Sequence, residues 1–142
     1  MRALLDVNVL IALLDTTHIH HNLARNWFAE NRTYGWASCP LTENGCLRII
    51  SQPNYSNSIP IKFALEKLNV ARRTPLHAFW PDDVSLLDFI TVNIEFIHGP
   101  KQLTDIYLLA LAVKNRGRLV SFDRKVPLSA VHGASAEHLL VI

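Results

Sequence analysis

Short apolar runs that read as buried strands alternate along this 142-residue chain with longer segments of helical pattern. We expect strands at residues 3–5, 36–39, 94–97 and 118–122. We expect helices at residues 7–14, around 23–28, and over 40–50, 60–71 and 104–113. Strands that alternate with helices through short connections are typical of an α/β sheet with helices on both faces. In such a fold, functional side chains gather outside the carboxyl ends of the strands.

Local signals mark the ends of some of these elements. The hydroxyl of Thr104 is expected to cap the last helix, and Gly117 is expected to stop it. The pattern is weaker between residues 76 and 96. There, Asp82 or Asp83 is expected to cap a short helix that runs to Phe89.

The composition fits a single domain of residues 1–142. A hydrophobic content of 49% is too high for a disordered chain. No stretch approaches the roughly 20 apolar residues that span a bilayer, and Asp6 and Asn8 interrupt the apolar start, which has no signal-peptide cleavage site. The two cysteines lack the spacing of a disulfide or metal motif. We therefore expect a cytoplasmic protein with no membrane association.

The formal charge of +2 is too small for a dedicated high-affinity nucleic-acid binder. Basic residues nevertheless crowd the region around Asp123, namely Lys114, Arg116, Arg118, Arg124 and Lys125. This crowding fits either a solvated surface or the positioning of phosphates.

Four acidic residues lie where an apolar element ends or begins. Asp6 and Asp123 follow expected strands, and Glu43 and Asp105 lie in expected first turns of helices. Singly, each fits a helix cap or a solvated turn. Together they would repel one another at a shared site, unless a divalent cation supplied the missing positive charge. The pattern therefore predicts one metal site.

Ligands that are all oxygens suit Mg²⁺ or Mn²⁺, which keep several waters and bind carboxylates together with phosphate oxygens. Such a site can lower the pKa of a bound water and direct it at a phosphodiester. No covalent nucleophile is then needed.

The segments LLDVNVLIALLD, LTENGCLRI, LTDIYLLALAV and LVSFD resemble, in order, the four acidic motifs of PIN domains, and specifically of VapC-type toxins. GWASCPLTENGCLRI and HAFWPDD are similar to segments of one bacterial VapC subgroup. The resemblance covers nearly the whole chain. It implies a PIN-like three-layer α/β/α sandwich with a mainly parallel sheet, and a Mg²⁺- or Mn²⁺-dependent endoribonuclease made with a cognate VapB antitoxin.

The resemblance also implies residue roles. Asp6, Glu43, Asp105 and Asp123 match the four acids of the family, with Asp6 and Asp105 the firmest metal ligands. Polar neighbours that orient carboxylates or waters are expected at Asn8, Thr104 and Ser121. Apart from the resemblance, the positions of Arg48 near Glu43 and of Arg116 and Arg124 near Asp123 predict contacts with substrate phosphates, although Arg48 equally fits an ion pair at the rim. The substrate would be tRNA or ribosomal RNA, and a homodimer is expected.

Three other functions are compatible with parts of the sequence. A haloacid dehalogenase-type phosphatase would need a proton carrier at Asn8, which an amide cannot be. A non-catalytic PIN-like module that binds a protein or RNA remains the main alternative, and a nuclease acting on structured DNA would usually bring additional elements.

Two groups of histidine and aromatic residues fit either a functional or a purely structural role. The histidines at 18, 20 and 21 fit a solvated helix start better than a zinc site. His77, Phe79 and Trp80 could stack an unpaired base, whereas Phe79 and Trp80 also fit the core.

Overall fold

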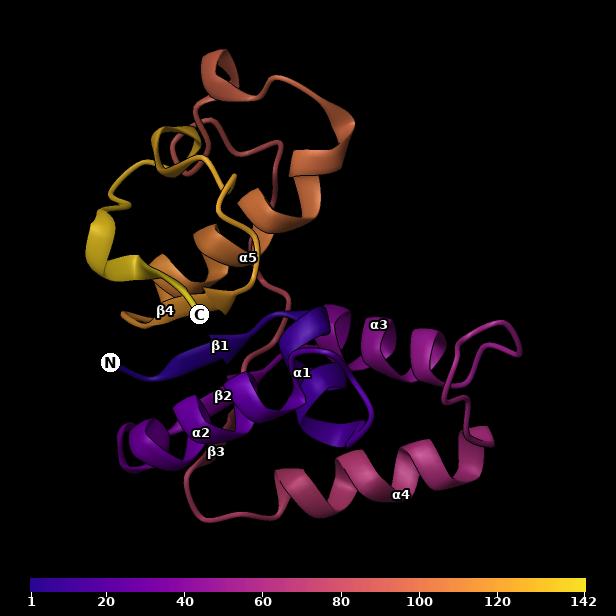
Figure 1. The fold of residues 1–142 in the computed structure, drawn as a ribbon. Helices are drawn as coiled ribbons and strands as arrows, with labels where there is room; N and C mark the ends of the chain where they lie inside the picture. The colour runs from indigo at the N-terminus through magenta and orange to yellow at the C-terminus, as the bar shows by residue number, and fades with distance from the viewer.

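Five short strands form one parallel sheet in the order β3-β2-β1-β4-β5, and the computed structural model describes all residues 1–142 (Figure 1). The strands are β1 (Ala3–Leu5), β2 (Trp36–Ser38), β3 (His77–Phe79), β4 (Arg118–Ser121) and β5 (Leu139–Val141). From β1 the chain adds β2 and β3 on one side and later β4 and β5 on the other. The order therefore reverses between β1 and β4, which makes that point the topological switch of the sheet.

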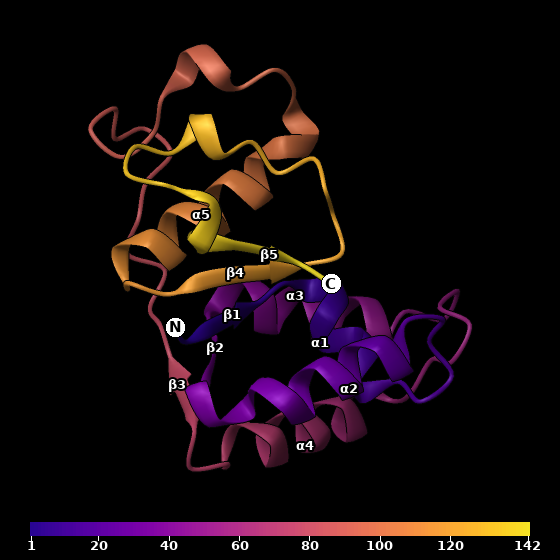
Figure 2. The same cartoon turned by 60° about the vertical axis from the view of Figure 1, so that its left-hand side comes forward.

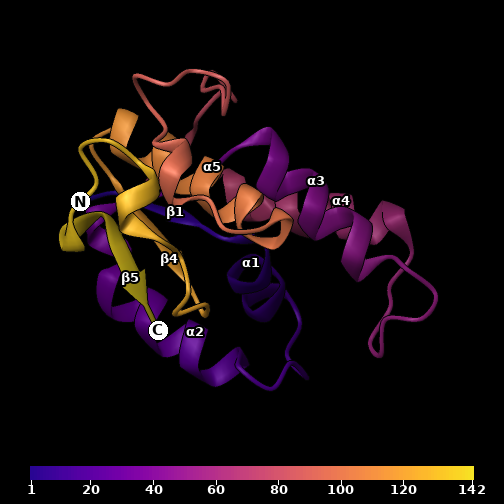
Figure 3. The same cartoon turned by 90° about the horizontal axis from the view of Figure 1, so that it is seen from above.

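Helices cover both faces of this sheet, as the alternation of elements predicted. They are α1 (Val7–Leu14), α2 (His21–Asn31), α3 (Pro40–Ile50), α4 (Ile61–Arg72) and α5 (Leu103–Lys114). Figures 1 and 2 show α5 on one face and α1 and α2 on the opposite face. Helix α3 packs on α1, and α4 packs on α3 at the side of the molecule, as the view from above also shows (Figure 3). The α/β fold with three layers is thus confirmed.

Successive side chains of a strand point to opposite faces of the sheet, so the hydrophobic core is divided into one cluster on each face. In β1, Leu4 belongs to the cluster under α5, whereas Ala3 and Leu5 belong to the cluster under α1 and α2. Helix α5 is buried on most sides, with Ile106 and Leu108 both fully inaccessible. A helix that is apolar nearly all round has to lie inside the fold, so the site-bearing end of α5 is firmly anchored.

Several expected elements differ in the structure. Residues 94–96 form a 3₁₀ turn in which Asn93 Oδ1 accepts a hydrogen bond from the backbone N–H of Glu95, so the expected strand there is wrong. Residues 82–89 contain no helix. The strands β3 and β5 were not predicted. Residues 77–79 (HAF) mix polar and apolar types over only three positions, whereas the apolar run at residues 139–142 fits a strand that the expected elements did not include.

The ends of α5 also differ from expectation. The helix begins at Leu103 directly after the 3₁₀ turn Pro100–Gln102, and no side chain caps it, so the expected cap at Thr104 is wrong. At its other end Arg116 takes the left-handed conformation, with φ of 53°. Gly117 is instead needed for space, because a Cβ there would lie 2.6 Å from both the Arg2 carbonyl oxygen and Trp80 Cη2.

A buried carboxylate fixes the turn that follows α1. Asp15 is 3% exposed, and its Oδ1 accepts hydrogen bonds from the backbone N–H and hydroxyl of Thr17 and from Asn57 Nδ2, while Tyr55 donates to Oδ2. Burial alone would raise the pKa of Asp15, but the hydrogen bonds from Tyr55, Asn57 and Thr17 hold it well below its ordinary value. The turn between α1 and α2 is therefore held to the loop that precedes α4.

None of the five helices combines the length and the apolar character that crossing a bilayer requires.

We expect Gly117→Ala to lower the free energy of unfolding by about 1–3 kcal/mol, because the added methyl group would push β1 and Trp80 apart. Gly99→Ala is the matched control, since a Cβ there meets nothing within 4 Å. Urea unfolding of both variants measures the difference. Equal stability of the two variants would show that the close approach at Gly117 does not constrain the fold.

Candidate active site

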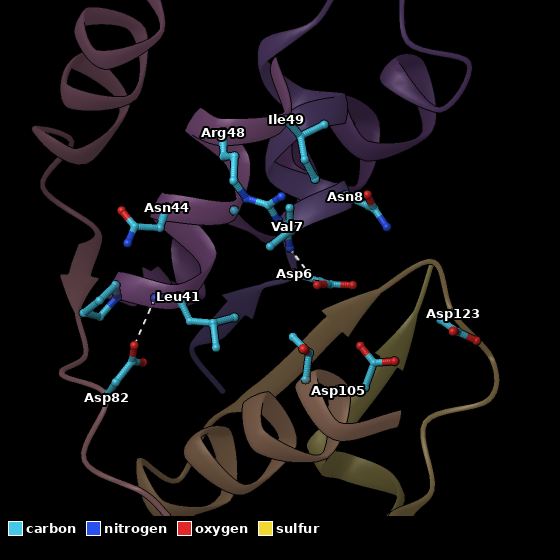
Figure 4. A pocket seen from close by; sticks show the side chains of 13 residues that line it. Asp6, Val7, Asn8, Leu41, Asn44, Arg48, Ile49, Asp82, Asp105 and Asp123 are labelled. Carbon is cyan, nitrogen blue, oxygen red and sulfur yellow. Dashed lines mark hydrogen bonds between the residues drawn. The ribbon is translucent and has the colours of Figure 1, made fainter. Parts of the chain in front are cut away.

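Three of the four predicted acids line a single pocket at the carboxyl edge of the sheet. Asp6 follows β1, Asp123 follows β4, and Asp105 lies in the first turn of α5. The pocket has a volume of about 600 Å³. Figure 4 shows Asp6 and Asp105 facing each other, with Asp123 at the rim. The acids therefore meet at the topological switch point, where the strand order opens a crevice.

Ser121 links two of these acids. Asp6 is 7% exposed; its Oδ1 accepts a hydrogen bond from the N–H of Val7 at 2.7 Å, and its Oδ2 accepts one from Ser121 Oγ at 2.8 Å. The same serine oxygen accepts from the N–H of Asp123 at 3.0 Å. Asp123 Oδ1 in turn accepts from the N–H of Lys125 at 2.7 Å. Ser121 thus lies in the orienting place expected for it.

Burial and neighbouring acids raise the pKa of Asp6 and of Asp105. Burial raises the pKa of Asp6, and the charge of Asp123 adds to this effect against the hydrogen bonds from Ser121 and Val7. Burial, followed by the charges of Asp6 and Asp123, raises the pKa of Asp105 to about 6. The pocket therefore concentrates negative charge that its own hydrogen bonds only partly balance.

This donor set fits a hard divalent cation. All the charged oxygens come from carboxylates, and the side chain of Asn8 adds an amide oxygen to the lining of the pocket. No three acidic, histidine or cysteine side chains lie so that they could hold a metal ion by themselves. An ion held here would therefore keep several of its waters, as Mg²⁺ usually does.

Glu43 does not join the other acids, contrary to the prediction. Its Oε1 lies 3.1 Å from Arg72 Nε and accepts a hydrogen bond from Ser38 Oγ at 2.6 Å. Ser38 Oγ is also 2.8 Å from His77 Nε2, whose pKa falls to about 4 through burial and the nearby charges of Arg72 and Arg2. A neutral His77 can donate to Ser38, which donates to Glu43. The glutamate thus ties β2, β3 and α4 together.

The turn of helix α3 explains this departure. Successive residues on an α-helix point about 100° apart, so Glu43 and Asn44 cannot face the same way. Asn44 and Arg48, four residues apart, line the acidic pocket, whereas Glu43 and Leu47 line a separate hollow under α4. The four-residue spacing of Asn44 and Arg48 indicates that these two side chains share one face of α3, but not in which direction that face points.

Gly45 lets α3 come close to the acids. A Cβ at this position would lie 2.7 Å from Val7 Cγ2, at the start of α1 and next to Asp6. Asp82, which the sequence marked only as a possible helix cap, lines the pocket, and its Oδ2 accepts a hydrogen bond from the N–H of Leu41 at 3.0 Å (Figure 4). It caps α3 from a distant segment and not a helix of its own.

The remaining predicted residues divide between the pocket and other places. Asn8, Thr104 and Arg48 line the pocket, and Arg48 makes no ion pair within the chain. Arg116 lies between α5 and β4 at the opposite edge of the sheet, so its predicted substrate contact is wrong. Arg124 is exposed beside Asp123 but is not part of the lining.

The aromatic residues after β2 have structural contacts. Trp80 is buried in the core, and the Phe79 ring lies 5.1 Å from the Arg72 guanidinium. His77 lies 4.3 Å from the Trp36 ring. The core interpretation therefore accounts for Trp80, and the other two rings belong to the network around Glu43.

The fold and the pocket together define an α/β protein with an acidic crevice at the switch point of a parallel sheet. A family model described as PIN domain matches residues 3–132. Ribonuclease VapC44 of Mycobacterium tuberculosis is 49% identical over 142 residues, which is 100% of both chains. The chain therefore belongs to the PIN-domain family and, within it, to the VapC toxins.

Two solved structures share the fold at low sequence identity. VapC20 of Mycobacterium tuberculosis, described as a sarcin-ricin loop cleaving toxin, has a TM-score of 0.61 at 11% identity, covering 87% of this chain and 92% of its own. VapBC2 of Rickettsia felis, bound to promoter DNA, has a TM-score of 0.59 at 12% identity, covering 88% and 90%. Both confirm the α/β architecture.

We expect Asp105→Asn to stabilise the metal-free protein at about pH 7.5 by roughly 1 kcal/mol. Because the pKa of Asp105 is raised to about 6 in the fold, the native state holds a proton that the unfolded chain has already released, and stability falls as the pH rises from about 4 to 6. The asparagine has no such charge. Urea unfolding in EDTA across this pH range measures the effect, and a variant less stable than the parent at every pH would contradict it.

Glu43→Gln should act in the opposite direction and lower the free energy of unfolding by about 1–2 kcal/mol, because Ser38 and Arg72 lose a charged partner. The same unfolding assay measures it, with Arg72→Gln and the double variant completing a cycle. If Glu43 belonged to the repelling cluster, the substitution would instead stabilise the metal-free protein.

Proposed function

We propose that the protein is a Mg²⁺- or Mn²⁺-dependent endoribonuclease and the toxin of a VapBC-type module. The observation that carries the proposal is the meeting of Asp6, Asp105 and Asp123 in one pocket, with the pKa of Asp105 raised by burial and by the charges of the other two. The full-length likeness to a protein named as a ribonuclease gives the reaction class. Carboxylates arranged in this way suit the hydrolysis of phosphodiester bonds with a metal-bound water.

In this proposal Asp6 and Asp105 hold the cation from β1 and α5, and Asp123 contributes from the rim. Mg²⁺ or Mn²⁺ supplies a water of lowered pKa and positive charge beside the phosphate. Ser121 keeps the Asp6 carboxylate turned toward the pocket through its 2.8 Å hydrogen bond. Asn8 and Thr104 border the same space and can orient waters.

Arg48 is the residue that we assign to the substrate phosphate. Its side chain lines the pocket and has no carboxylate partner within the chain, although Asp6 and Asp105 lie in the same cavity (Figure 4). A guanidinium can bind two phosphate oxygens at once. Arg124, exposed beside Asp123, is placed to meet the neighbouring backbone of the RNA.

The partners follow from the family. A cognate VapB-type antitoxin would block the site, in keeping with the VapBC2 complex whose toxin shares this fold. Unpaired loops of tRNA or ribosomal RNA are the proposed substrates, because their bases and backbone are open to a surface pocket. A homodimer and a location in the cytoplasm complete the proposal.

We expect the purified chain, freed of any antitoxin, to cut RNA at one or a few sites when Mg²⁺ or Mn²⁺ is present. Asp6→Asn and Asp105→Asn should each lower the rate by at least about 1000-fold, because removing a charged ligand takes away the positive centre at the phosphate. Glu43→Gln should retain measurable cleavage, since Glu43 faces α4. Sequencing of RNA ends after induction identifies the sites, and gel assays of labelled RNA give the rates.

Cleavage that persists in excess EDTA, or full activity in both aspartate variants, would overturn the metal mechanism. Growth inhibition separates the remaining alternative: toxicity that survives Asp105→Asn would favour a non-catalytic binding module.

A further inference from the structure

Three aromatic rings form an open cluster beside the acidic pocket. His20 lies 4.7 Å from Phe122 between ring centroids, and His18 lies 6.5 Å from Phe122 with its plane tilted by 16°. The two histidine rings are 5.8 Å apart. Phe122 directly precedes Asp123, whose carboxylate lines the pocket. The cluster therefore lies next to the rim of the proposed active site.

The cluster is held in place and yet accessible. Backbone N–H of His20 donates to His18 Nδ1 at 3.0 Å, and the turn that carries both rings is fixed by the buried Asp15. Phe122 packs partly on the core under α1 and α2, whereas His20 is exposed. A ring that is fixed on one side and open on the other can receive a planar ligand at little cost in conformational entropy.

The surrounding charges favour a nucleotide as that ligand. Arg124 and Lys125 are exposed directly after Asp123, in the same loop as Phe122. A cationic loop beside aromatic rings is the combination with which proteins bind single-stranded nucleic acid, the cations meeting phosphates and the rings meeting bases. The histidines at 18, 20 and 21 do not form a group that could hold a metal ion, and His18 Nδ1 already accepts a hydrogen bond from the backbone N–H of His20.

We propose that His20 and Phe122, supported by His18, form a stacking site for an unpaired base of the RNA next to the phosphate that Arg48 would bind in the acidic pocket. This inference rests on the proposed ribonuclease function. It gives the enzyme a preference for single-stranded loops, because a base within a duplex cannot turn out onto the rings without being unstacked.

Binding to two probes tests the site. The protein carries Asp105→Asn so that cleavage is absent, and the probes are a fluorescein-labelled unstructured RNA of about 12 nucleotides and an abasic ribose-phosphate chain of the same length. His20→Ala should weaken RNA binding by about 5- to 100-fold, the range for loss of one stacked base, and leave binding of the abasic chain unchanged. His20→Phe, which keeps a ring without a charge, should restore RNA binding. Fluorescence anisotropy gives the dissociation constants.

Ile19→Ala is the matched control, because Ile19 lies between the two histidines on the same turn and is 89% exposed. Equal RNA affinity of the His20→Ala and Ile19→Ala proteins would overturn the proposal. An equal loss on the abasic chain, or no binding of RNA at all, would also overturn it.

Failure of the stacking site and failure of the ribonuclease function give different results. If the unmodified protein cuts RNA while His20→Ala binds and cuts like it, the stacking site is wrong and the nuclease stands. If no RNA is cut while the difference between RNA and abasic chain persists, the nuclease function is wrong and the base-binding site stands.

Discussion

The carboxylates of Asp6, Asp105 and Asp123 repel one another at the carboxyl edge of the sheet. The surrounding structure has to hold them together against this repulsion. The pairing of β1 with β4 brings the first and last of these acids together, and Ser121 and the N–H of Val7 hold the Asp6 carboxylate in place. Asp105 is held opposite them because the rest of α5 is buried in the core. The packing of the fold therefore opposes a charge repulsion, which adds to burial in raising the pKa of Asp105.

The two sides of helix α3 separate structural from chemical tasks. Asn44 and Arg48 face the acids, and Gly45 allows the close approach to Val7 that places them there. Glu43 faces the other way and joins β2 and β3 to α4 through Ser38, His77 and Arg72. An ion pair on one side of the helix thus supports the position of the side chains on the other.

Regular patterns in the sequence predicted the elements that have many local signals. The buried run before Asp6, the apolar α5 and the Pro40 start of α3 were all found as expected. The strand at residues 77–79 was missed because three residues of mixed polar and apolar type carry almost no periodic signal. The apolar run at residues 139–141 shows no alternation that would separate a strand from a helical turn. Their parallel pairing with β2 and β4 makes them the two edge strands of the sheet.

The sequence by itself determined that strands alternate with helices and that acids follow the strands and open the helices, because both depend on local apolar patterns and on residue order. Only the tertiary structure decided which acids meet. Asp6, Asp105 and Asp123 converge because parallel strands present their carboxyl ends at one edge, whereas the direction of Glu43 depends on the rotation of α3 against α4. The spacing of residues along the chain does not determine this rotation. The rotation of α3 is set by the packing of Gly45 on Val7 and by the ion pair between Arg72 and Glu43.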